Sequence, residues 1–305
     1  MEGTVDGFRY GVVTPIAAYV MACLGGALGL RCIVRSLLNA ESWKAGWLAL
    51  GAASIGCGIW TMHFIAMIGF QVEETRIRYD AGLTLLSLAV SIVVVGIGVF
   101  IVGYRGAGTA NLSLAGIVTG IGVAAMHYLG MYAMRLNGAI SYDALAVGLS
   151  VVIAIVAATA ALWAAVTIRG FMTSLGASLV MGVAVSGMHY TAMAAVSVHV
   201  HGTTGGSWAG DSASSLLLPM LLGPVIFLVL AGVVVMFDPL LVLGDSEGSR
   251  SRPAARREPA AARKPTTWST EEAPAPTHSS LFETPASPAR ARQHPYDTPQ
   301  RAGEW

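Results

Sequence analysis

Seven apolar stretches follow one another along the chain, separated by short polar segments. They cover residues 10–30, 47–70, 81–103, 111–134, 144–168, 173–196 and 216–237, and none of them contains Asp, Glu, Lys or Arg. Each is close to the roughly 20 residues that an α-helix needs to cross the hydrocarbon core of a bilayer, and longer than the roughly 10 residues of a spanning β-strand. The pattern predicts an all-α integral membrane protein with seven transmembrane helices.

The composition supports this prediction. Of the 305 residues, 54% are hydrophobic and 11% are charged, against about 25% charged residues in an average soluble domain. The lipid bilayer is therefore the first expected partner, and the cell membrane the expected location. A net charge of +1 gives no reason to expect a nucleic-acid partner. Cys23, Cys32 and Cys57 lack the spacing of a metal site or a redox motif, so no disulfide is predicted.

The chain divides into three predicted regions. Residues 1–9 form an extracytoplasmic N-terminus, residues 10–240 form the membrane domain, and residues 245–305 form a tail rich in proline and alanine. Such a tail cannot bury enough apolar surface to offset the entropy lost on ordering, so we expect it to be disordered.

Basic residues between the helices predict the orientation. The connections after the first, third and fifth helices carry five Lys or Arg residues, with Arg31, Arg35 and Lys44 after the first, whereas the other connections carry three. The tail adds further arginines. By the positive-inside rule, the N-terminus lies outside and the C-terminus in the cytoplasm.

A sequence motif recurs three times at a nearly constant spacing. It reads GCGIWTMHFIAM at 56–67, GIGVAAMHYLGM at 120–131 and GVAVSGMHYTAM at 182–193. The spacing equals two helices with their connections, so the second, fourth and sixth helices carry the motif and run in the same direction. The membrane domain is thus predicted to consist of three parallel two-helix repeats followed by a seventh helix.

The motif histidines are the candidate metal ligands. Each stands about 10 Å below the assumed outer end of its helix, at 1.5 Å per residue, so the three share one depth and can converge inside the bundle. An intramembrane ionisable residue is a candidate functional residue by default. The motif glycines Gly56, Gly120 and Gly182 lie on the same helix face two turns away, and predict that this face packs against other helices.

Methionines flank every histidine and suggest the metal. The residue four positions later shares the face of the histidine, and the preceding residue lies beside it. Imidazole and thioether together favour copper, because thioethers are soft ligands that prefer Cu(I). No carboxylate lies in any apolar stretch, which argues against zinc, magnesium and calcium sites built on Asp or Glu. The predicted ligands are His63, Met62, Met67, His127, Met126, Met131, His189, Met188 and Met193.

With three such motifs on alternate helices, residues 10–240 resemble the MHYT family of bacterial integral-membrane sensor domains. The resemblance implies a site near the outer face that binds one or two copper ions and responds to dioxygen, carbon monoxide or nitric oxide. Relatives of this kind often carry a cytoplasmic signalling domain. None is recognisable after Gly244, so the resemblance predicts a standalone form that signals to a separate cytoplasmic or membrane partner.

The aromatic position of the motif holds Phe64, Tyr128 and Tyr190. The motif calls for tyrosine, so Phe64 departs from it. A packing or interfacial role is the ordinary expectation for these rings, and the two tyrosines could in addition donate hydrogen bonds to a bound ligand.

Other functions remain compatible with the sequence. Two histidines could be the axial ligands of a haem in an electron carrier, or the three could form a relay in a transporter or proton pathway. A structural or assembly role, such as copper insertion into an oxidase, is a further alternative. An enzyme is not expected, because the chain shows no nucleophile–base pair and no nucleotide-binding motif.

Overall fold

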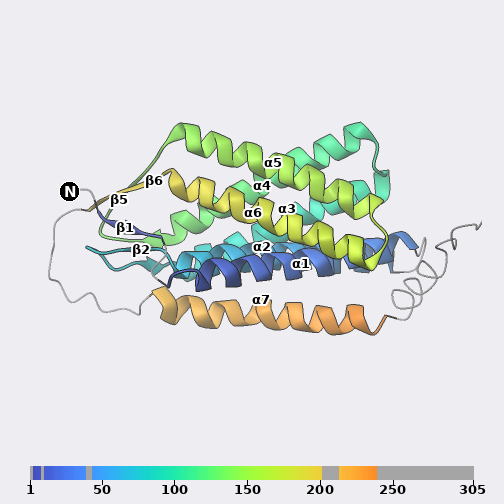
Figure 1. The fold of residues 1–305 in the computed structure, drawn as a ribbon, viewed down its shortest axis with the longest axis horizontal. Helices are drawn as coiled ribbons and strands as arrows, with labels where there is room; N and C mark the ends of the chain where they lie inside the picture. Colours follow the sequence, from blue (N-terminus) through green and yellow to red (C-terminus); the bar gives the residue numbers. More distant parts are fainter. Residues whose placement is uncertain (1–2, 8–9, 39–42, 201–212, 239–305) are drawn as a thin grey trace, which may run out of the picture. The chain divides into compact units, whose positions relative to one another are not determined.

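The computed structural model describes residues 3–7, 10–38, 43–200 and 213–238, all within the structural unit Met1–Pro253. It confirms the seven predicted helices, each long and apolar enough to cross a membrane (Figure 1). The predicted tail, 245–305, lies outside the described residues. The helices are α1 (Val13–Leu38), α2 (Lys44–Ile68), α3 (Ala81–Arg105), α4 (Thr109–Ala133), α5 (Ala144–Thr167), α6 (Phe171–Ala194) and α7 (Ala213–Met236).

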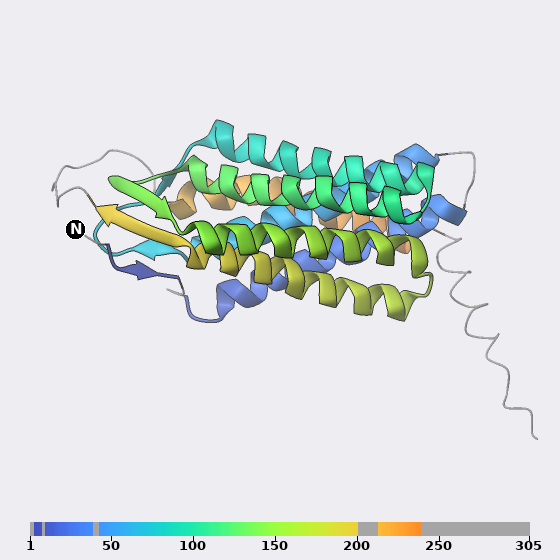
Figure 2. The same cartoon turned by 90° about the horizontal axis from the view of Figure 1, so that it is seen from above.

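The first six helices form a ring. Each packs against the next along the chain, and α6 closes the ring against α1. Helix α7 packs outside the ring, against α2 and α1 (Figures 1 and 2). The ring places the three motif helices α2, α4 and α6 at alternate positions, so one face of each can point toward the centre of the ring.

Short β-strands join the helices at one end of the bundle, a feature that the apolar pattern did not predict. Three antiparallel pairs form there: β1 with β2, β3 with β4, and β5 with β6. In each pair, one strand precedes an odd-numbered helix and its partner follows the next even-numbered helix. Each repeat is therefore a strand–helix–helix–strand unit. The strands are β1 (Val5–Asp6), β2 (Gln71–Val72), β3 (Arg78–Tyr79), β4 (Met134–Arg135), β5 (Gly138–Tyr142) and β6 (Val196–Val200).

Equivalent aspartates start the second and third repeats. Asp80 caps α3 by accepting a hydrogen bond from the Leu83 amide, and Asp143 caps α5 in the same way. A side-chain cap satisfies one of the amides that the first helical turn leaves without a partner. The backbone amide of each aspartate donates to a carbonyl at the end of the motif helix in the same repeat, at 2.9 Å. These contacts fix the entry of α3 and α5 relative to α4 and α6.

The motif glycines lie at helix contacts, as predicted. A Cβ atom at Gly56 would stand 2.8 Å from the Cα of Ile92 on α3, and one at Gly182 would stand 2.5 Å from the Sγ of Cys23 on α1. A Cβ at Gly120 would overlap the backbone of Ile155 on α5. Each motif helix thus packs closely on the odd-numbered helix of the following repeat.

The boundary of the first helix was predicted wrongly. Arg31 and Arg35 were assigned to a connection, but α1 continues to Leu38 and both arginines are buried within it. They are tolerated there because their long stems cover apolar surface and their charged groups find partners. The Arg35 guanidinium pairs with Asp238 at 2.8 Å, just after α7, and Arg31 lies over the ring of Phe171. The predicted orientation across the membrane stays a prediction.

Candidate metal centre

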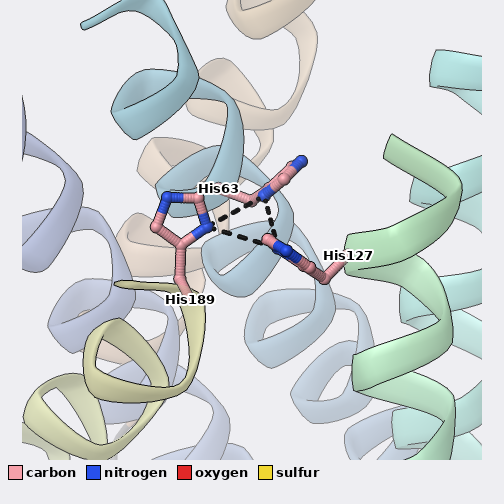
Figure 3. A group of neighbouring side chains, drawn as sticks. All are labelled: His63, His127 and His189. Atoms are coloured by element: carbon pink, nitrogen blue, oxygen red, sulfur yellow. Dashed lines mark hydrogen bonds between the residues drawn. The ribbon is translucent and has the colours of Figure 1, made fainter. Parts of the chain in front are cut away.

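The three motif histidines meet inside the ring, as predicted. They come from α2, α4 and α6, and each is 1–2% exposed. Their Nδ1 atoms form a triangle with sides of 3.1 Å between His63 and His127, 3.2 Å between His63 and His189, and 3.3 Å between His127 and His189 (Figure 3). Among the described residues, they are the one group of three or more His, Cys, Asp or Glu side chains close enough to hold an ion.

Hydrogen bonding alone cannot satisfy this triangle. A ring nitrogen of neutral imidazole either carries a proton and donates, or carries one lone pair and accepts. If no Nδ1 carries a proton, three lone pairs converge, and if one does, the other two lone pairs still face each other. If two carry protons, both compete for a single lone pair, and if all three do, no acceptor remains. A cation at the centre removes the conflict, because each lone pair then points at a positive charge.

The dimensions fit a transition-metal ion. A point equidistant from the three nitrogens lies about 1.9 Å from each, close to the roughly 2.0–2.1 Å of a metal–imidazole bond. The three nitrogens would thus hold a transition-metal ion at bonding distance with little movement of the protein.

Ring packing holds the imidazoles in place. The histidine rings lie nearly perpendicular to one another, at interplanar angles of 77–80°. Each also meets the aromatic residue that follows it edge to face, with centroid distances of 4.6 Å to Phe64 and 5.0 Å to Tyr128 and Tyr190. The motif aromatics therefore support the histidines, which accords with the packing role expected for them. A direct contact with a ligand stays a prediction.

Two of the three outer ring nitrogens are held without hydrogen bonds. The Nε2 atoms of His63 and His127 are buried and find no partner among the described residues. Metal ligands of this type more often donate their second N–H to a carboxylate or carbonyl. For His63, Gly130 of α4 provides the room: a Cβ there would stand 2.5 Å from Nε2. Steric packing, in place of a hydrogen bond, orients this imidazole.

A tryptophan compensates for the phenylalanine in the first motif, which the sequence alone did not suggest. In the second motif the hydroxyl of Tyr128 is hydrogen-bonded to Ser150 of α5 at 2.9 Å. The equivalent serine on α3 is Ser87, and it accepts a 2.9 Å hydrogen bond from the indole of Trp60. Phe64 packs against Trp60. Both interhelical hydrogen bonds are thus present although one motif lacks its hydroxyl.

The motif methionines surround the site without defining it. Five are almost fully buried, and Met193 is half-buried against the core. The converging atoms of the centre are the imidazole nitrogens, so coordination by a thioether stays a prediction. The five are Met62, Met67, Met126, Met131 and Met188.

The strands cover the site at their end of the bundle. The ring of Tyr79, in β3, meets Phe64 edge to face at 5.9 Å, and strand residues belong to the same buried core as the motif helices. Burial raises the pKa of Tyr79 above its ordinary value, so its hydroxyl stays protonated at neutral pH. Tyr79 therefore adds no negative charge beside Phe64.

Residues 56–115 and 120–177 match the MHYT repeat, described as the bacterial signalling protein N-terminal repeat. The two matches begin at the motif glycines Gly56 and Gly120. The chain belongs to the MHYT domain family. The third motif, which begins at Gly182, lies beyond the matched residues but contributes His189 to the same triangle.

MHYT relatives are larger signalling proteins. The bifunctional diguanylate cyclase/cyclic di-GMP phosphodiesterase MucR of Pseudomonas aeruginosa is 34% identical over 82% of this chain and 37% of its own length. The cyclic di-GMP phosphodiesterase NbdA of the same organism is 35% identical over 65% of this chain and 27% of its own length. The signaling protein YkoW of Bacillus subtilis is 27% identical over 59% of this chain. No solved structure matches the chain.

These alignments span only about a quarter to two-fifths of the relatives' length. The chain thus corresponds to the membrane sensor domain of bacterial signalling proteins, and its seven candidate spans agree with a location in the bacterial membrane.

Proposed function

We propose that this protein is a copper-binding membrane sensor that responds to a diatomic gas or to redox state. One observation carries the proposal: three Nδ1 atoms, buried in an apolar bundle, lie 3.1–3.3 Å apart. His63, His127 and His189 would hold one ion between them. When bound, copper would supply a redox-active centre with a position open to a small ligand.

Copper(I) suits this environment better than a divalent ion does. The three imidazoles are neutral ligands, and no carboxylate belongs to the described cluster to offset the charge of an ion. The cost of burying an ion rises with the square of its charge, so a singly charged ion costs about a quarter as much as a doubly charged ion of equal size. Buried thioethers nearby would add soft ligands that prefer Cu(I).

The signal would be transmitted by a change in how α7 packs against its neighbours. This helix lies against α2, which carries His63, and against α1. A shift in the histidine triangle on ligand binding would alter the contact between α2 and α7, provided that the bound and free states pack differently. The names of the relatives suggest a partner that makes or degrades cyclic di-GMP. We expect no catalytic activity in the membrane domain itself.

Two alternatives fit the geometry less well. Axial haem ligands face each other across a macrocycle, whereas these nitrogens converge on one point. A proton pathway needs polar groups that continue the relay. Instead, the side chains one turn below the histidines on the same helix faces are Ile59, Val123 and Val185.

Metal analysis of anaerobically purified protein tests the proposal. Wild type should hold about one copper per chain, and the variant with His63, His127 and His189 all changed to alanine should hold none. His199→Ala, at an exposed histidine of β6, is the matched control and should keep the metal. His189→Asn alone should weaken binding, which keeps the test usable if the triple variant does not fold. Equal copper in wild type and both triad variants would refute the proposal.

A further inference from the structure

An apolar cavity of about 40 Å³ lies inside the helix ring. On each motif helix, it is lined by the residues four and eight positions before the histidine. Since residues four apart share a helix face, the histidine lies one turn further along each of these faces. The cavity is therefore about one helical turn from the triad, on the side away from the strands. The six residues are Ile59, Val123 and Val185 in the nearer layer, and Ile55, Thr119 and Met181 in the farther one.

Small side chains of α5 leave this space open. Isoleucine and valine line it from α1 and α3, whereas α5 contributes Leu162 and five alanines along one face. The five are Ala154, Ala157, Ala158, Ala161 and Ala165.

The cavity is too apolar to favour water. The hydroxyl of Thr119 is the one polar side-chain group in its lining, and this hydroxyl already lies 3.4 Å from the Val94 carbonyl. A buried water usually makes two to four hydrogen bonds, and cavities without such partners stay dry and accept nonpolar guests. A water needs roughly 10–15 Å³ by this measure, so the space suits a molecule of two or three atoms.

We propose that this cavity binds a nonpolar diatomic gas such as dioxygen, which enters from the bilayer and is held beneath the histidine triad. A nonpolar gas dissolves better in hydrocarbon than in water because water must open a cavity for it. The membrane therefore supplies the ligand at the level of the site. Met188 lines the cavity and precedes His189, so the guest lies next to the triad. That last link, from guest to metal, rests on the proposed copper centre.

Xenon binding to the metal-free protein tests the cavity independently of copper. Wild type in detergent should show a saturable ¹²⁹Xe chemical-shift change, and Ala158→Leu, which fills the cavity, should abolish it. Ala160→Leu adds the same side chain at an exposed position of the same helix and should leave xenon binding intact. Ala161→Val is a smaller filling variant that should weaken binding, for use if Ala158→Leu does not fold.

Two results would overturn the inference: no saturable xenon binding by wild type, or equal binding by the filling and control variants. Copper content measured in the protein as isolated, before the metal is removed for the xenon experiment, separates the two proposals. A wild type that is isolated with copper but binds no xenon refutes the gas cavity alone. A wild type that is isolated without copper but binds xenon refutes the metal centre alone.

Discussion

Replacing Gly130 with alanine should weaken metal binding while the fold persists. The added Cβ would stand 2.5 Å from the Nε2 of His63, 3.1 Å from its Cδ2 and 3.2 Å from the Cζ of Phe64. Ordinary contact begins at about 3.4 Å, so the imidazole must move by roughly 0.9 Å, or the two helices must separate. Overpacking of this size costs about 1–3 kcal/mol of stability.

The displacement matters more for the metal than for the fold. Metal–ligand distances tolerate deviations of about 0.2 Å, and losing the support of a ligand typically lowers metal affinity about 10- to 100-fold. We therefore expect Gly130→Ala to lower the Cu(I) affinity by about one to two orders of magnitude. This affinity is measured under anaerobic conditions by competition with a chelator that becomes coloured when it binds Cu(I). A thermal melt in detergent shows whether the variant is still folded.

Gly187→Ala is the matched control. Gly187 lies in a motif helix two residues before His189, and a Cβ there would meet nothing within 4 Å. Both variants change a helical glycine to alanine, so intrinsic helix propensity shifts equally. If Gly130→Ala bound Cu(I) as tightly as Gly187→Ala, the packing that positions His63 would not govern the site, and the geometric account would fail.

Two further predictions concern the supports of the site and of α7. Trp60→Phe removes the indole donor to Ser87 and should lower the thermal midpoint, since a buried hydrogen bond contributes about 1 kcal/mol. Adding Phe64→Tyr to this variant should restore part of the lost stability. If it restored none, the hydrogen bonds of Trp60 and Tyr128 would not be equivalent. Asp238→Asn leaves Arg35 buried without its counter-charge, and breaking such a pair costs about 3–5 kcal/mol. Amide exchange in α7 should then quicken, whereas unchanged exchange would show that the pair does not hold this helix.

The histidine triangle could be predicted because two regularities coincide. The motif spacing of two helices puts His63, His127 and His189 at one depth on helices of one direction. Glycines on the same face predict that this face packs against other helices and does not face lipid. Three histidines at one depth, each on the packing face of its helix, are expected to meet. This expectation does not require knowledge of the helix order around the ring.

Other features depend on contacts that no local pattern records. Most of the capping strands are two residues long, too short for the alternation that marks a strand. The extension of α1 through Arg35 depends on Asp238, about two hundred residues later in the chain. The cavity depends on which face of α5 turns inward, and that face is set by packing against α4 and α6.

X-ray absorption at the copper edge tests the central claim most directly. Protein loaded with one Cu(I) per chain should show a low-coordinate site with imidazole nitrogens at about 2.0 Å and the outer-shell scattering of histidine rings. His189→Asn should lose one nitrogen from that shell. A wild-type spectrum of sulfur ligands alone, or one that His189→Asn leaves unchanged, would contradict a copper ion held by the three Nδ1 atoms.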